Sequence, residues 1–139
     1  MGPIKKVTKN INSKVYQEEI INDINVVCKS LVFPQKSPIF MHNLAPAHNS
    51  ISTQKFLAER NVSVLPWPEN SADCNIIENV WSYISRWLQG YNCTTSEGLW
   101  NAVQKIWWNI PSDYIKTLYQ SMPNRVKFVN KGHGRITKY

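Results

Sequence analysis

The sequence is poor in the features that mark secreted and membrane proteins. Its 139 residues include three cysteines, an odd number placed too far apart for a CxxC pair, and the chain has no signal-like start. This pattern indicates a reducing intracellular compartment. No uncharged apolar run approaches the roughly 18–20 residues of a membrane helix, so we expect no membrane span. The three cysteines are Cys28, Cys74 and Cys93.

Acidic residues are also scarce. Nine acids stand against 16 basic residues, which gives a formal net charge of +7. Four lysines precede the first acid and six basic residues follow the last one, Asp113. Basic ends predict contact with a polyanion, because a basic side chain at a phosphate releases condensed counterions; the alternative is two solvated ends that favour solubility. The candidate nucleic-acid contacts are Lys5, Lys6, Lys9, Lys14, Arg125, Lys127, Lys131, Arg135 and Lys138.

Apolar residues are abundant enough for a core. Hydrophobic residues make up 42% of the chain, which excludes a disordered polycation. Two short apolar runs, 39–41 and 62–65, flank a helical pattern over 51–60, so we predict two parallel strands joined by a crossover helix. A strand end at 4–7 and a helix from Ser13 precede them. The predicted class is α/β, with short parallel strands, a crossover helix and a helical C-terminal half.

Capping residues and prolines predict where the later helices begin. Asn75 with Glu78, and Thr94 with Glu97, have the spacing of a capping box. Pro111 opens the last helix, in which Pro123 predicts a kink or a restart. Helical periodicity places three tryptophans on core faces and leaves two as candidates for exposure. The core set is Trp81, Trp87 and Trp107, and the exposed set is Trp67 and Trp108.

Three phrases, in order along the chain, carry a family resemblance. Residues 41–48 read MHNLAPAH, residues 65–68 read LPWP and residues 71–81 read SADCNIIENVW. With these phrases the chain resembles the catalytic core of Tc/mariner superfamily transposases. The resemblance implies a ribonuclease-H-like fold in which three carboxylates hold two divalent ions, Mg²⁺ or Mn²⁺, for DNA strand cleavage and transfer.

The resemblance also implies that the acidic triad is depleted here. The third acid corresponds to Glu78 and the second to Asn43, a neutral residue, with the family's spacing of thirty-four residues between them. These two positions are the candidate catalytic and metal-binding residues, and we expect weak metal binding. Glu78 also has a structural explanation as the capping partner of Asn75. The resemblance implies that the chain begins after the first acid and after the family's helix-turn-helix region.

Two histidines and a cysteine offer an alternative metal site. His42, His48 and Cys74 carry the right ligand atoms for zinc, but no pair of them has the close spacing of structural zinc ligands. We therefore expect His48 to pack or to form a hydrogen bond near the end of the first predicted strand.

The leading functional hypothesis treats residues 1–139 as a truncated DDE catalytic domain in the nucleus or cytoplasm. It has lost strand cleavage and keeps nonspecific DNA binding. One alternative is a domesticated, non-catalytic protein-interaction module built on the helical half. Another is one piece of a longer, functional transposase. The resemblance also implies that the strand expected beside 39–41 is missing, and the open sheet edge predicts a homodimer or a partner that covers it.

Overall fold

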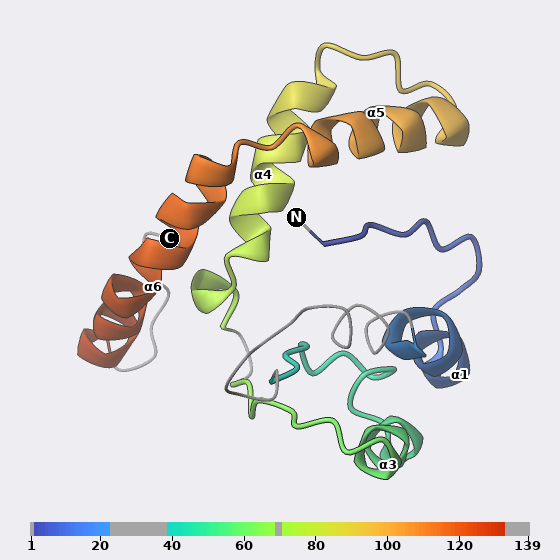
Figure 1. Ribbon diagram of the computed structural model, residues 1–139, viewed down its shortest axis with the longest axis vertical. Coiled ribbons are helices and arrows are strands. Elements are labelled where there is room, and N and C mark those ends of the chain that lie inside the picture. The colour runs from blue at the N-terminus through green and yellow to red at the C-terminus, as the bar shows by residue number, and fades with distance from the viewer. Residues whose placement is uncertain (1, 23–38, 69–70, 133–139) are drawn as a thin grey trace. The chain divides into compact units, whose positions relative to one another are not determined.

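The chain forms two units, each with its own core. The structure is a computed structural model that describes residues 2–22, 39–68 and 71–132 (Figure 1). Unit 1 comprises Met1–Lys6 and Asn70–Tyr139, and unit 2 comprises Val7–Glu69. The part of the first predicted helix beyond residue 22, together with Cys28, lies outside the described residues. None of the described helices has the length and apolar content needed to cross a bilayer.

Two short helical segments open unit 2. Helix α1, Ser13–Val15, continues into the π-helix η1, Tyr16–Ile21. The predicted start is correct to within one residue, but the cap is Asn12, whose side chain accepts a hydrogen bond from an N–H of the first turn. A π-helix brings residues five apart onto one face. The first and last residues of η1 are accordingly both buried.

Helix α3, Ile51–Glu59, confirms the predicted crossover helix. Ser50 caps it by accepting a hydrogen bond from the Thr53 N–H at 3.2 Å, as serine does at many helix starts. Asn61 follows the helix with a φ of 54°, a left-handed conformation that asparagine tolerates better than most residues. Both ends of the helix are therefore set by local polar residues.

The two predicted strands are reduced to one isolated parallel bridge between Phe40 and Val64. The Phe40 N–H donates to the Ser63 carbonyl, and the Leu65 N–H donates to the Phe40 carbonyl, both at 2.8 Å. The parallel pairing is thus correct. The predicted strand lengths are wrong, because two hydrogen bonds fix a single residue pair and the described neighbours on either side form no ladder.

Two further strand predictions concern the edges of this bridge. The N–H and the carbonyl of Phe40 both point toward residues 63–65. In an extended chain these groups alternate in direction, so the N–H and carbonyl groups of Ile39 and Met41 point to the other edge, away from residues 63–65. A partner for that edge stays a prediction. The predicted strand end at 4–7 is wrong: these residues are irregular, and Ile4 packs instead against the core of unit 1.

The core of unit 2 joins its helices to the loop that follows the bridge. Tyr16, Ile21 and Leu57 are buried together. Thr53 is fully buried, and its hydroxyl donates to the Ala47 carbonyl at 2.8 Å. This hydrogen bond fixes the loop over residues 42–49 against α3.

Apart from the irregular residues 2–6, the described part of unit 1 is mostly helical. A 3-10 turn, η2, covers Ala72–Cys74, and the three predicted helices follow it as α4, α5 and α6 (Figure 1). Their buried side chains meet in one core, and this tertiary packing stabilises the helices. The bounds are Ile77–Leu88 for α4, Ser96–Trp108 for α5 and Ser112–Lys131 for α6. The buried core residues are Val80, Ile84, Ile106, Trp107, Ile110 and Leu118.

Both predicted capping boxes are wrong in register. The Asn75 side chain accepts a hydrogen bond from the Ile77 N–H at 3.3 Å, but the cap position of α4 is Ile76, which has no side-chain cap. η2 ends at residue 74, so Asn75 is extended and lies one residue too early. Thr95, not Thr94, caps α5 by accepting from the Gly98 N–H at 3.0 Å.

Helix α6 begins after Pro111, as predicted, and runs through Pro123 to Lys131, so the predicted restart is wrong. Proline removes one intrahelical hydrogen bond. Leu118 and Arg125, on either side of it, are both buried. Their packing holds the helix continuous at Pro123, where one intrahelical hydrogen bond is missing.

The tryptophan predictions are correct for Trp107, which is buried, and for Trp108, which is 59% exposed. They are wrong for Trp81 and Trp87, which are 42% and 56% exposed. The buried stripe of α4 is narrow, and these two rings lie on its two flanks, where Trp81 contacts the ring of Trp107 and Trp87 contacts the ring of Tyr83. Trp67, a candidate for exposure, is half-buried.

Candidate functional site

Asn43, the candidate second-acid position, lies in the loop of unit 2 between the bridge and α3. Its Oδ1 atom accepts a hydrogen bond from the Ala45 N–H at 3.2 Å and lies 2.6 Å from Nδ1 of His48. A backbone N–H can only donate, so this atom is the amide oxygen and His48 must donate through Nδ1. The loop therefore fixes both the orientation of Asn43 and the tautomer of neutral His48. The predicted hydrogen bond of His48 is confirmed.

Tyr16 and His42 lie beside this pair. The Tyr16 hydroxyl is 3.0 Å from Nδ1 of His42, and its ring stacks on that of His48 with a centroid distance of 4.0 Å. The two histidine rings are parallel to within 11°, with centroids 5.5 Å apart. We call Tyr16, His42, Asn43 and His48 the histidine cluster. The sequence pattern identified Tyr16 only as an apolar-face residue, and its role here was missed.

Burial shifts the ionisation of this cluster. It raises the pKa of Tyr16 to about 12. It also lowers the pKa of His42, and the nearby His48 lowers it further. The pKa of His48 is lowered by burial too, and hydrogen bonding to Asn43 partly opposes that shift. All three side chains are therefore neutral near pH 7.

Acid should weaken unit 2 through these histidines. Their pKa values are lowered on folding, so the unfolded chain binds protons first, and stability is lost as pH falls below about 6.5. We expect the urea midpoint to fall from pH 7.5 to pH 5.5, and to fall less in the double variant His42→Gln/His48→Gln. Circular dichroism checks this. Equal pH dependence of the two proteins would contradict it.

Glu78, the candidate third acid, lies in unit 1 on the exposed side of the first turn of α4. A carboxylate there interacts favourably with the positive end of the helix dipole. Asn43 belongs to unit 2, so the two candidate catalytic residues come from separate units. Cys74, from the zinc alternative, is likewise in unit 1, away in sequence from both histidines.

Within neither unit do the described residues fit a site for two divalent ions. Mg²⁺ and Mn²⁺ favour several hard, preferably anionic, oxygen ligands. The oxygen of Asn43 is neutral and already accepts two hydrogen bonds. Within residues 2–22, 39–68 and 71–132, no three His, Cys, Asp or Glu side chains are gathered as metal ligands.

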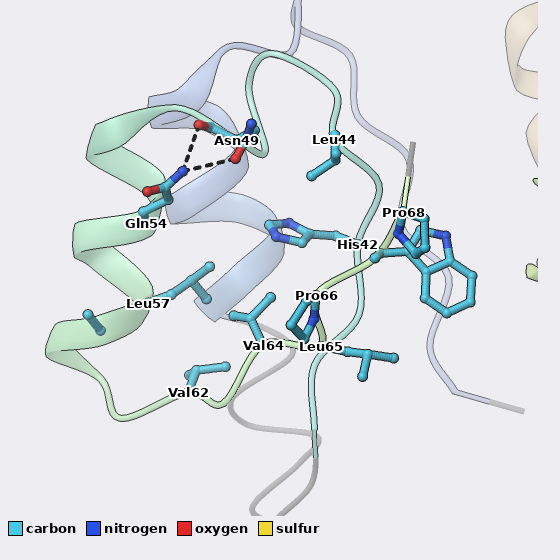
Figure 2. Close-up of a pocket in the computed structure, with 12 residues that line it drawn as sticks. His42, Leu44, Asn49, Gln54, Leu57, Val62, Val64, Leu65, Pro66 and Pro68 are labelled. Atoms are coloured by element: carbon cyan, nitrogen blue, oxygen red, sulfur yellow. Dashed lines mark hydrogen bonds between the residues drawn. The ribbon is translucent and has the colours of Figure 1, made fainter. Parts of the chain in front are cut away.

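A pocket of about 730 Å³ adjoins the histidine cluster in unit 2. Figure 2 shows the ring of His42 with Leu57 and Val64 near it, and Asn49 and Gln54 joined by two hydrogen bonds at one end. The lining is mostly apolar, and Pro66 and Pro68 of the LPWP phrase form part of it. The sequence did not reveal this hollow, because its residues come from three separate segments.

The structure separates the candidate nucleic-acid contacts into four groups. Arg125 is 2% exposed, and its guanidinium donates three hydrogen bonds to internal acceptors. Its prediction as a phosphate contact is therefore wrong. Lys9 is exposed but pairs with Glu19 at 3.1 Å. Arg135 and Lys138 lie outside the described residues. The remaining candidates, at least partly exposed, are Lys5, Lys6, Lys14, Lys127 and Lys131.

Known proteins match this chain in sequence. The DDE superfamily endonuclease family matches residues 3–100. Across all 139 residues the chain is 30% identical to the transposable element Tcb1 transposase of Caenorhabditis briggsae and 29% identical to the transposable element Tc1 transposase of Caenorhabditis elegans. It spans 50% of the length of each.

A solved structure matches the fold. The catalytic domain of Mos1 mariner transposase superposes with a TM-score of 0.81 at 18% identity, over 96% of this chain and 67% of that one. This likeness supports the predicted ribonuclease-H-like fold, although the described residues pair at one bridge only. The same Mos1 domain has been solved with raltegravir and Mn or Mg. The family match covers more than half of the chain, which therefore belongs to the DDE superfamily endonucleases, among the homologues of Tc1/mariner transposases.

Proposed function

We propose that this chain is a DNA-binding, non-cleaving form of the Tc1/mariner catalytic domain that acts in the nucleus. The observation that carries the proposal is the pair of hydrogen bonds that the neutral side chain of Asn43 accepts. Its amide oxygen accepts one from the Ala45 N–H and one from His48. The chain spans half the length of its transposase relatives. Because the chain covers only half of these transposases, DNA binding and the loss of cleavage are both proposed for it.

Charge explains why one substitution has a large effect. Two metal ions stabilise the attacking and the leaving oxygens of a phosphodiester, and anionic ligands must hold those ions together against their mutual repulsion. Asparagine removes one negative charge from this set. Here its side-chain oxygen already accepts hydrogen bonds from the Ala45 N–H and from His48, so coordination of a cation by that oxygen would cost two hydrogen bonds. The position is suited to holding the loop rather than a metal.

A plasmid nicking assay tests the loss of cleavage. With Mg²⁺ or Mn²⁺ we expect the purified chain to relax supercoiled DNA no faster than buffer alone, and Glu78→Ala to behave in the same way. An active endonuclease in the same buffers is the positive control. Nicking that depends on the metal and disappears in Glu78→Ala would overturn the proposal.

A protein-interaction module is the second candidate, and the exposed rings of Trp87 and Trp108 favour it. Exposed aromatic side chains are enriched at protein interfaces. DNA retention separates the two functions: a folded chain that does not bind duplex DNA at 50 mM salt favours the module. A homodimer, predicted from the sheet edge, would appear in sedimentation as a species of twice the chain mass.

A further inference from the structure

Three exposed lysines share one face of α6. Lys127 lies eleven positions, about three turns, after Lys116, and Lys131 follows one turn later, so the three side chains lie within an arc of roughly 60°. All three are exposed. They span about 22 Å along the helix. Lys116 was not among the contacts that the sequence analysis singled out.

The opposite face of α6 fixes this orientation. Leu118 is buried in the core of unit 1. The guanidinium of Arg125 donates to Ser121, to the Asp73 carbonyl and to Asn79, each at 2.9 Å. The helix therefore cannot turn about its axis without breaking these contacts, and the lysine face stays directed away from the core.

The charge on the lysine face is not balanced locally. Neither of the ion pairs Lys9–Glu19 and Lys55–Glu59 involves this face. Asp113 is the one acid in α6, at its start. Lys127 and Lys131 are four residues apart, an arrangement in which like charges repel.

The helix dipole explains only part of this pattern. Lysine is favourable in the last turn of a helix, where Lys131 lies. The effect fades within one turn, so it contributes nothing to Lys116 in the second turn. A row of positive charges along the whole helix, with uncharged Gln120 and Asn124 between them, matches a linear polyanion.

We infer that the lysine face of α6 is the surface on which this chain receives the phosphate backbone of duplex DNA. The inference rests on the proposed function and narrows its DNA contact to one helix, with Lys116 in place of Arg125. Each lysine neutralises a phosphate and reads no base. Binding through this face is therefore independent of sequence and strongly dependent on salt.

The test compares two variants of equal charge change. Lys116→Gln/Lys127→Gln/Lys131→Gln removes the lysine face. Lys55→Gln/Arg86→Gln/Lys105→Gln removes three basic side chains that are exposed elsewhere. Fluorescence anisotropy with a mixed-sequence 30-base-pair duplex gives the dissociation constant from 50 to 200 mM NaCl. Circular dichroism confirms that both variants melt as the wild type does.

Loss of three phosphate contacts should make the slope of log K against log salt shallower by about 2.7. At 100 mM NaCl, affinity should fall on the order of 100-fold. The control variant should keep the wild-type slope to within about 0.5, because slope counts contacts and not net charge.

The outcomes separate this inference from the proposed function. Equal slopes for the two variants, with wild-type binding intact, overturn the lysine face and leave the proposed function standing. Stronger binding to vesicles containing 30% phosphatidylserine than to DNA also overturns it, in favour of a membrane surface. If the wild type does not bind DNA, both the proposed DNA binding and the inferred role of the lysine face are overturned. The nicking assay tests the loss of cleavage independently.

Discussion

Replacing Trp107 by alanine is expected to lower the free energy of unfolding by about 3–5 kcal/mol, the usual cost of deleting a buried aromatic side chain. The indole is buried in the core of unit 1, and its N–H donates to the Gly2 carbonyl at 2.8 Å. Alanine leaves a cavity and an unpaired carbonyl. Trp107→Phe keeps most of the apolar volume and loses the hydrogen bond, so it should cost only about 1–2 kcal/mol.

The chain offers a matched control at the next position. Trp108 has the same residue type in the same helix, but it is 59% exposed. Trp108→Ala should cost less than about 1 kcal/mol. Urea unfolding followed by circular dichroism measures all three variants. If Trp107→Ala and Trp108→Ala lower the midpoint equally, the described packing of α5 is incorrect.

Arg125→Ala should be the other strongly destabilising change, by about 3 kcal/mol. Two of its three hydrogen bonds join α6 to η2 and to α4, the third is made within α6, and removing the guanidinium leaves partly buried acceptors on Asp73, Asn79 and Ser121. With a urea m-value of about 1–3 kcal/mol/M, the midpoint should fall by roughly 1–3 M. Lys127→Ala, an exposed change two residues on, should shift it little.

A double-mutant cycle makes this prediction sharper. Asn79→Ala removes one acceptor of Arg125, so the two changes should be less than additive when combined. Additive losses would mean that the pair contributes no coupling energy. They would leave the hydrogen bonds to Ser121 and to the Asp73 carbonyl, with burial of the aliphatic part of the side chain, as the contributions of Arg125.

The helices of unit 1 could be predicted from the sequence because their apolar residues recur at helical spacing. Capping residues were harder. Thr94 and Thr95 are adjacent and chemically equal, and only the close approach of Gly98 to the Thr95 hydroxyl selects the second one. Trp81 and Trp87 lie at the borders of the periodic stripe of α4, where the pattern does not determine burial.

Buried polar residues could not be predicted. An arginine in a basic stretch normally indicates a solvent-exposed side chain. Arg125 can be buried because three oxygens accept its hydrogen bonds, and two of them lie more than forty residues away in sequence. At the candidate site, the phrase around Asn43 identified the position and the missing charge. Its hydrogen bonds depend on how the loop closes, and Tyr16 comes from a separate helix.

The hydrogen bond between Trp107 and Gly2 also has a consequence for synthesis on the ribosome. It joins residues 105 positions apart, and all of unit 2 lies between them in sequence. At a translation rate of about 5–20 residues per second, α5 is synthesised roughly 5–20 s after residues 2–6. Unit 2 can fold during this interval, but unit 1 cannot complete its core until its two segments are both translated.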